Sequence, residues 1–272
     1  MASSSPKYTA PALDKGLDIL EVLANADQPM SLNALAKAMG RTVSEIFRMA
    51  VTLEQRGYLS LDENDRYSLS LKMLELSHRQ QPLRSLVATA TPLMRELAGR
   101  AYQSCHLSVY HDGQLLVVAQ VDAPGPFTMG AKVGALGKLS DTASGKVLLA
   151  FRDEAERTRM LAAQIRIHGE LEIDAAQLLR QIDEARRDGS ITSPSSRIRG
   201  ATDVSRPIFG NDREVVAALT VPHYERLDRP QSPSIPDVEG HVREIAERLS
   251  QLLCYTGHSE LEEARAALGR GS

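Results

Sequence analysis

The chain has 272 residues, of which 25% are charged and 42% are hydrophobic, as in an ordinary globular protein. Its formal net charge of −3 excludes a polycation that coats nucleic acid or membrane over its whole surface. Any contact with nucleic acid must therefore come from a local patch. The two cysteines, Cys105 and Cys254, are too few and too far apart for a disulfide framework or a zinc site.

The sequence contains no apolar run of about 18 residues and no secretion signal. We therefore expect a cytoplasmic protein with no membrane association and no bound cofactor or metal. Residues 1–12 are polar and rich in Ser, Pro and Ala, and are expected to form a flexible tail.

Two helices are predicted after this tail. Leucine and valine recur at helical spacing over residues 13–26. Ser31 can cap a second helix that runs to Met39, because its side chain can accept a hydrogen bond from a first-turn amide. Gly40 follows, and glycine is favoured where a helix ends in a left-handed backbone conformation.

A third helix and a hairpin complete the first domain. The helix is expected over residues 43–56, with apolar side chains on one face. Residues 58–70 read as strand, turn and strand, since the polar cluster 62–65 separates two alternating segments. Three helices followed by a hairpin predict a winged helix-turn-helix over residues 13–70.

The start of the third helix carries polar side chains that lie outside the apolar face expected to pack against the other helices. In a helix-turn-helix, such a face enters the major groove of DNA. Arg can pair with guanine, Thr and Ser can reach phosphates or base edges, and Glu can accept from the cytosine amino group. The predicted contacts with double-stranded operator DNA are Arg41, Thr42, Ser44, Glu45, Arg48 and Arg66.

The local charge leaves an alternative open. Residues 13–78 contain seven basic and ten acidic residues, and the hairpin turn is acidic. DNA binding therefore requires the basic side chains to lie on one side. The alternative is a protein-interaction adaptor that carries a winged helix.

The rest of the chain predicts an α+β domain over residues 85–256, joined by a linker helix over 71–84 and followed by a tail over 257–272. Strands that bracket helices favour an antiparallel sheet flanked by helices over a parallel sheet. In chain order, the expected elements are a helix over 85–100 that begins or breaks at Thr91-Pro92, a hairpin around 111–113, a helix within 142–151, helices over 153–163 and 174–188, strands over 202–209 and 213–223, and a helix over 237–256.

The helix within 142–151 offers a binding site for a small anion. Ser140, Asp141 or Thr142 can cap it, and its first amides, including those of Ala143 and Ser144, have no intrahelical partner. A small carboxylate suits such a helix start through these amides and the helix dipole. The alternative is that the cap residues and water satisfy these donors.

An enzyme that processes small molecules is the second alternative. No group of residues shows catalytic spacing, and no nucleophile elbow is present. The segment around Ser140 and Val147 lacks the Gly and the Ser or Thr that a phosphate-binding loop requires. We therefore predict no catalytic residue.

Several segments resemble the IclR-type transcriptional regulators. They are "ALDKGLDILEVLA", "SLNALAKAMG", "LEQRGYL", "GAKVGALGKLSDTASGKVLLAF" and "VVAALTVP", and the resemblance covers about residues 12–255 in order. It implies a winged helix on DNA, a GAF-like effector-binding domain, and a homodimer or tetramer on palindromic operators.

We expect a small organic effector of the carboxylate, amide or hydrazide type, and the resemblance implies which positions contact it. Asp203 is the most informative of them, because a buried carboxylate is costly unless it has a partner. It meets either a donor on the ligand or one of Arg197, Arg199 and Arg206. The implied effector contacts are Met129, Gly137, Ala143, Ser144, Ser193, Ala201, Asp203, Thr220 and Pro222.

Overall fold

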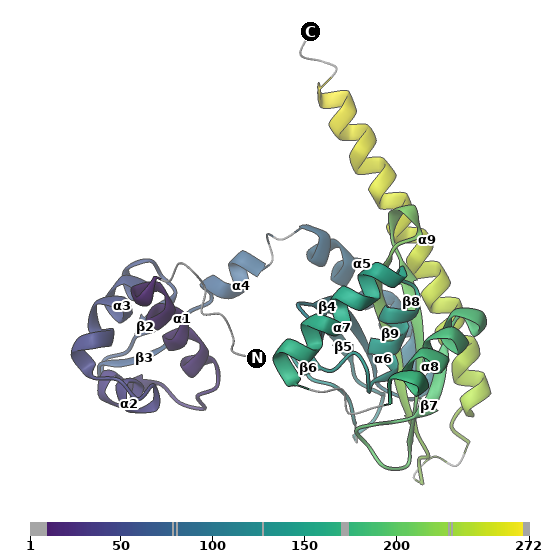
Figure 1. The fold of residues 1–272 in the computed structure, drawn as a ribbon, viewed down its shortest axis with the longest axis horizontal. Helices are drawn as coiled ribbons and strands as arrows, with labels where there is room; N and C mark the ends of the chain where they lie inside the picture. The colour runs from purple at the N-terminus through teal and green to yellow at the C-terminus, as the bar shows by residue number, and fades with distance from the viewer. Residues whose placement is uncertain are drawn as a thin grey trace. The chain divides into compact units, whose positions relative to one another are not determined.

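The computed structural model describes residues 10–77, 79, 81–126, 128–169, 174–227, 229 and 231–268, without the side chains of residues 81, 82, 212 and 254–268. The chain forms two compact units, which divide between Arg84 and Ser85 (Figure 1). We call them the amino-terminal unit and the carboxyl-terminal unit.

The amino-terminal unit is the predicted winged helix-turn-helix. Its small sheet is antiparallel in the order β1-β3-β2, and Leu61 pairs with Tyr67 across the hairpin. The elements are α1 (Pro11–Ala24), β1 (Met30–Ser31), α2 (Leu32–Ala38), α3 (Val43–Gln55), β2 (Leu59–Leu61), β3 (Arg66–Leu69) and α4 (Lys72–Ser77).

Local sequence signals explain the turn between α2 and α3. The Ser31 hydroxyl accepts a hydrogen bond from the Ala34 amide at 3.3 Å and caps α2. Gly40 has a φ of +61°, a conformation that side-chain-bearing residues rarely adopt. Beyond this turn, α3 buries Ile46 and Ala50 completely in the core of the unit.

The connector between the units consists of two helices. The linker helix expected over 71–84 corresponds to α4, which ends at Ser77, and to the first turn of α5 (Gln81–Ala101). The expected start or break at Thr91-Pro92 is wrong, because Pro92 lies inside α5. Proline removes one helical hydrogen bond, and burial of Met94 and other residues of α5 offsets this loss.

The carboxyl-terminal unit is built on a six-stranded antiparallel sheet in the order β6-β5-β4-β9-β8-β7. Its remaining elements are β4 (Cys105–His111), β5 (Gln114–Val121), β6 (Leu136–Gly137), α6 (Ala143–Ala150), α7 (Glu154–His168), α8 (Ala175–Asp188), β7 (Ile191–Pro194), β8 (Ala201–Phe209), η1 (Asn211–Arg213), β9 (Val215–Tyr224) and α9 (Ile235–Leu268).

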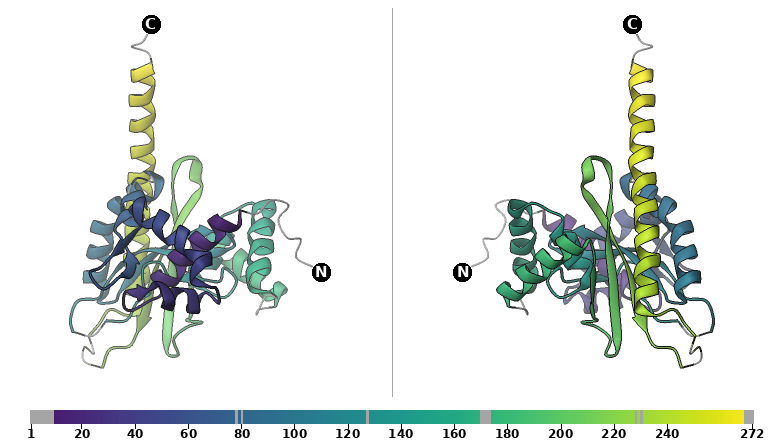
Figure 2. Two further views of the ribbon diagram at one scale, coloured as in Figure 1. Left: turned by 90° about the vertical axis from the view of Figure 1, so that its left-hand side faces the viewer. Right: turned by 90° about the vertical axis from the view of Figure 1, so that its right-hand side faces the viewer.

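Helices cover both faces of this sheet. Side chains alternate along β9, so Ala217, Leu219 and Val221 pack in the core shared with α5 and α9, whereas Ala218 packs in the core shared with α6, α7 and α8. Figure 2 shows α9 along the face of the β8–β9 pair. The predicted α+β class, with an antiparallel sheet flanked by helices, is confirmed.

The ends of the chain differ in part from the expectation. Helix α9 continues to Leu268, beyond the predicted end at 256 and through most of the segment expected as a tail. Residues 269–272 and residues 1–9 lie outside the described residues.

Candidate functional site

A cavity of about 280 Å³ lies in the carboxyl-terminal unit, between the sheet and the first turn of α6. Strands β4, β5, β8 and β9 form its floor, and loop residues complete it. The lining residues are His106, Leu115, Val117, Gly130, Ala131, Ala135, Leu136, Gly137, Thr142, Ala143, Ser144, Ser195, Arg197, Ile198, Asp203, Thr220 and Pro222.

The first turn of α6 is held close to the loop that precedes it. Thr142 is the cap, and its hydroxyl accepts a hydrogen bond from the Gly145 amide at 3.1 Å. A Cβ on Gly145 would lie 2.5 Å from the Leu139 Cα, so only glycine fits without a shift of the backbone. The close contact between Gly145 and Leu139 therefore fixes the position of the first turn of α6 in the wall of the cavity.

Gln164 of α7 forms hydrogen bonds to the loop that precedes α6. Its Oε1 accepts hydrogen bonds from the Leu139 amide at 2.7 Å and the Ser140 amide at 3.1 Å. Its Nε2 donates to the Ser140 hydroxyl at 2.7 Å. Gln164 is only 1% exposed, so these bonds replace water for three buried polar groups.

Two amides at the start of α6 remain available. Among the described residues, no hydrogen bond uses the amides of Ala143 or Ser144, and the first turn contains no acidic side chain. Both residues line the cavity. The helix start therefore presents free donors and the positive end of its dipole to the cavity.

A chain of hydroxyl groups crosses the middle of the cavity floor. The Thr220 hydroxyl lies 2.8 Å from those of both Ser205 and Ser144, and the Ser144 hydroxyl lies 3.4 Å from His106 Nε2. Burial lowers the pKa of His106 to about 4, so the imidazole is neutral near pH 7. Its Nδ1 is buried without a partner among the described residues.

Asp203 stands at the polar end of the cavity. Burial raises the pKa of its carboxyl group, while the Ser195 hydroxyl and the Lys146 charge act in the opposite direction. Within the described chain, no cation lies in ion-pair distance of Asp203. Arg197 instead pairs with Asp141 at 3.3 Å. Of the two alternatives for Asp203, the internal pair with a nearby arginine is therefore not formed.

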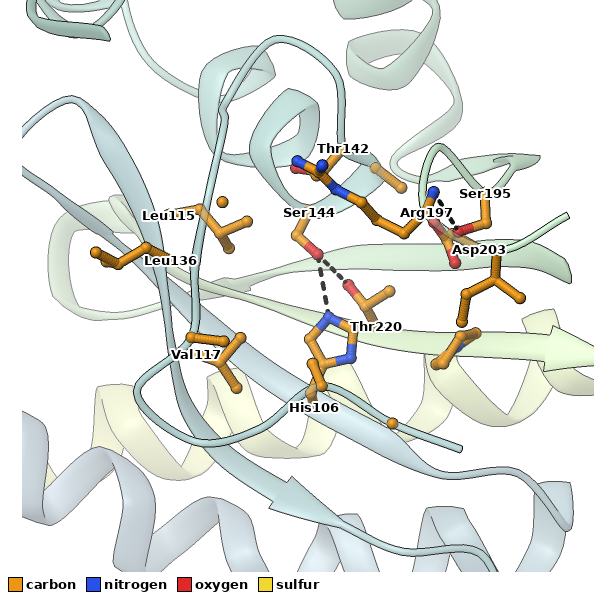
Figure 3. Close-up of a pocket in the computed structure, with 17 residues that line it drawn as sticks. His106, Leu115, Val117, Leu136, Thr142, Ser144, Ser195, Arg197, Asp203 and Thr220 are labelled. Atoms are coloured by element: carbon orange, nitrogen blue, oxygen red, sulfur yellow. Dashed lines mark hydrogen bonds between the residues drawn. The ribbon is translucent and has the colours of Figure 1, made fainter. Parts of the chain in front are cut away.

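The two ends of the cavity differ in character. Figure 3 shows Leu115, Val117 and Leu136 at one end, and Ser195, Arg197 and Asp203 at the other. The chain of Ser144, Thr220 and His106 lies between them. Such a cavity suits a small molecule with an apolar body and polar groups at defined positions.

Six of the nine expected effector contacts line the cavity: Gly137, Ala143, Ser144, Asp203, Thr220 and Pro222. The other three lie elsewhere. Met129 is a loop residue that is 41% exposed. Ser193 lines a second, smaller cavity beside Lys146. Ala201 is buried at the start of β8, where it pairs with Tyr224.

Sequence reasoning did not assign the apolar wall. Leu115 and Val117 are alternate residues of β5, and their period-2 spacing was the only signal that could have placed them on one face. Leu136 and Ile198 belong to other segments that the fold brings to the same cavity.

In the amino-terminal unit, Glu45 organises the start of α3. Its carboxylate accepts hydrogen bonds from the Thr42 amide at 2.9 Å and the Thr42 hydroxyl at 2.8 Å. Lys15 lies at 3.4 Å and Arg41 at 4.0 Å. The Thr42 hydrogen bonds, followed by Lys15, lower the pKa of Glu45 to about 2.

The other expected DNA contacts are exposed. Arg41, Thr42, Ser44 and Arg48 are solvent-accessible at the start and along the outer face of α3. Arg66 is exposed at the start of β3, and its amide donates to the Asp62 carboxylate at 2.8 Å. Arg48 thus lies on the surface of the amino-terminal unit.

No described helix is long and apolar enough to span a membrane. No group of three His, Cys, Asp or Glu side chains within the described ranges is arranged to hold a metal ion.

Comparison with known families identifies both units. Residues 12–63 match the IclR helix-turn-helix domain, and residues 82–251, more than half of the chain, match the family described as "Bacterial transcriptional regulator IclR C-terminal". The chain belongs to the IclR family. As an IclR regulator, it couples a DNA-binding domain to an effector-binding domain, and a small molecule bound in the second controls its affinity for operator DNA.

Relatives of known name are also regulators. The HTH-type transcriptional regulator KdgR of Escherichia coli is 27% identical over 210 residues, which cover 76% of this chain and 80% of KdgR. The glycerol operon regulatory protein of Streptomyces coelicolor is 25% identical over 242 residues, which cover 88% of this chain and 95% of that protein.

Solved structures show the same fold. The IclR homologue from Microbacterium hydrocarbonoxydans, in complex with 4-hydroxybenzoate, has a TM-score of 0.74 and 21% identity over 89% of this chain and 98% of its own. HmgR of Pseudomonas aeruginosa has a TM-score of 0.69 and 25% identity over 90% of this chain and all of its own.

Proposed function

We propose that this IclR regulator reads its operator with the exposed start of α3 and senses a small hydroxylated or aminated acid, amide or hydrazide in the cavity above β4 and β9. The observation that supports the proposed effector site is the pair of free amides at the start of α6 in the same cavity as the Asp203 carboxylate, which forms no ion pair among the described residues. Because the proposed operator is DNA, we propose that the protein acts in the cytoplasm.

The proposed DNA contacts are the side chains that α3 leaves exposed. Arg41, Thr42, Ser44 and Arg48 reach phosphates and base edges in the major groove, with Arg66 of the wing as a further phosphate contact. Glu45 is proposed to position Thr42 and Arg41 on this surface, because its carboxylate accepts hydrogen bonds from Thr42 and forms an ion pair with Arg41.

The proposed effector joins the start of α6 to Asp203 at the polar end of the cavity. Its carboxylate or carbonyl oxygen accepts from the amides of Ala143 and Ser144, and its hydroxyl or amine donates to Asp203. Its apolar body lies against Leu115 and Val117. The 4-hydroxybenzoate bound by the homologue has both kinds of polar group on one small ring, which supports this class of ligand.

The amino-terminal unit is proposed to pair with a second copy. Its outer helices expose apolar side chains, with Leu13 and Leu17 of α1 at 61% and 48%, and Leu71 and Met73 near α4 at 78% and 47%. Exposed apolar groups on two helices suit a homodimer contact. A dimer places two α3 helices in successive major grooves, about 34 Å apart, and two dimers form the proposed tetramer.

Replacement of Asp203 by Asn tests the effector site. We expect 4-hydroxybenzoate, its amide or its hydrazide to raise the melting temperature of the wild type by mass action. D203N should bind the same compound about tenfold more weakly, because a neutral acceptor replaces a charged one. The matched control is D183N, which changes an exposed aspartate of α8.

Operator affinity must be measured in the same series. The bound compound should change the affinity for operator DNA by about 1–3 kcal/mol. A compound that binds the wild type but leaves operator affinity unchanged contradicts the coupling. Equal binding by D203N and the wild type contradicts the role of Asp203.

A further inference from the structure

The α3 helix exposes one large apolar side chain beside its polar ones. Phe47 is 50% exposed, whereas Ile46 and Ala50 on the same helix are fully buried. The core of the amino-terminal unit, as far as the described residues go, does not include Phe47. The ring therefore adds little to the packing of its own unit.

The position of Phe47 on the helix is also specific. Ser44 and Val51 lie three residues before it and four after it, so all three are neighbours on the surface of α3. Arg48 follows directly and is exposed. The ring thus lies within the face that is proposed to enter the major groove.

We propose that Phe47 reads a thymine through its 5-methyl group, an inference that rests on the proposed DNA contact of α3. A phenyl ring has no donor or acceptor, so it cannot pair with the polar edges of the bases. Among the groups that base pairs present in the major groove, the thymine methyl is the apolar one, and Phe is a known contact for it. Ser44 and Arg48 supply polar contacts on either side.

The test removes the methyl group and nothing else. The full-length protein first selects a duplex from a library of random sequences. Each thymine of the selected duplex is then replaced in turn by deoxyuridine, and the dissociation constant is measured for the wild type and for Phe47→Ala.

We expect one thymine in a half-site at which uridine weakens wild-type binding by about fourfold, the effect of burying one methyl group. Phe47→Ala should bind the thymine and uridine duplexes equally at that position, while Phe47→Leu keeps part of the difference. The control Leu179→Ala removes an apolar side chain of α8 that is 52% exposed, and should keep the fourfold ratio.

Two results overturn the inference. Either the wild type binds every uridine duplex as tightly as the thymine duplex, or Phe47→Ala keeps the wild-type ratio while its melting temperature is unchanged. A protein that selects no sequence at all contradicts the proposed DNA contact as well, so the two failures can be told apart.

Discussion

Helices α3 and α6 both begin after a threonine, and their first turns are built in opposite ways. At α3, Glu45 of the same turn binds Thr42, and the surroundings are open to solvent. At α6, Thr142 caps the helix, the first turn has no acid, and Gln164 from another helix holds the preceding loop inside the protein.

This difference separates the two tasks of the regulator. A carboxylate already occupies the start of α3, so the backbone amides at this end of the helix do not offer a free anion site, and the proposed DNA contacts are made by side chains. The start of α6 has no such carboxylate and is enclosed, where a helix dipole and free amides act most strongly on a ligand.

The largest expected effect follows from the buried support of α6. Gln164→Leu leaves the amides of Leu139 and Ser140 buried without a partner, and each such group costs about 2 kcal/mol, or about 4 kcal/mol in all. Calorimetric unfolding should show this loss in the carboxyl-terminal unit. Gln177→Leu, an exposed change on α8, is the control. Equal stability of the two variants would show that the loop does not depend on Gln164.

Arg48→Ala probes the exposed face of α3. We expect operator binding to weaken by about 1–3 kcal/mol if the guanidinium contacts a base, with no change in melting temperature because the side chain is exposed. A gel-shift titration against Arg180→Ala, an exposed arginine of α8, measures the difference. If Arg48→Ala and Arg180→Ala bind the operator with the same affinity, Arg48 does not contact a base.

A substitution in the turn before α3 should have a smaller effect than the two changes above. Gly40→Ala places a side chain at a φ of +61°, which costs about 1 kcal/mol of the free energy of unfolding of the amino-terminal unit. Gly16→Ala lies inside α1 with no atom near the added Cβ and should stabilise the unit by about 0.5–1 kcal/mol. If both substitutions change the free energy of unfolding in the same direction, the positive φ of Gly40 is not what requires glycine there.

The smallest effect concerns Glu45 and depends on pH. Its pKa is lowered in the folded state from 4.5 to about 2, so its stabilising contribution is present above pH 4.5 and is lost as the pH falls toward 2. The difference in stability between Glu45→Gln and the wild type should therefore be largest above pH 4.5 and should shrink steadily as the pH falls toward 2. Hydrogen exchange of α3 amides can follow this, and a difference that is constant with pH would exclude the carboxylate as its source.

The same contrast shows which features could be predicted from the sequence. Thr42 and Glu45 are three residues apart, and Gly40 ends a helix where glycine is favoured, so local patterns were sufficient for the winged helix. Phe47 was not singled out, because apolar residues on a helix are normally assigned to its buried face.

The cavity could be predicted only in part. The free amides of Ala143 and Ser144 follow from their place at a helix start. The partnership of Gln164 with Leu139 and the contact of Ser144 with His106 join residues 25 and 38 positions apart, and no periodicity reports such distances. They depend on how α7 and β4 pack against α6.

The neutral imidazole of His106 has a consequence for the way the cavity responds to pH. Its proton is gained only near pH 4, whereas an ordinary histidine changes its charge between about pH 5 and 8. This side chain therefore lines the cavity in one protonation state throughout that range, and a ligand in contact with it meets the same pattern of donors and acceptors.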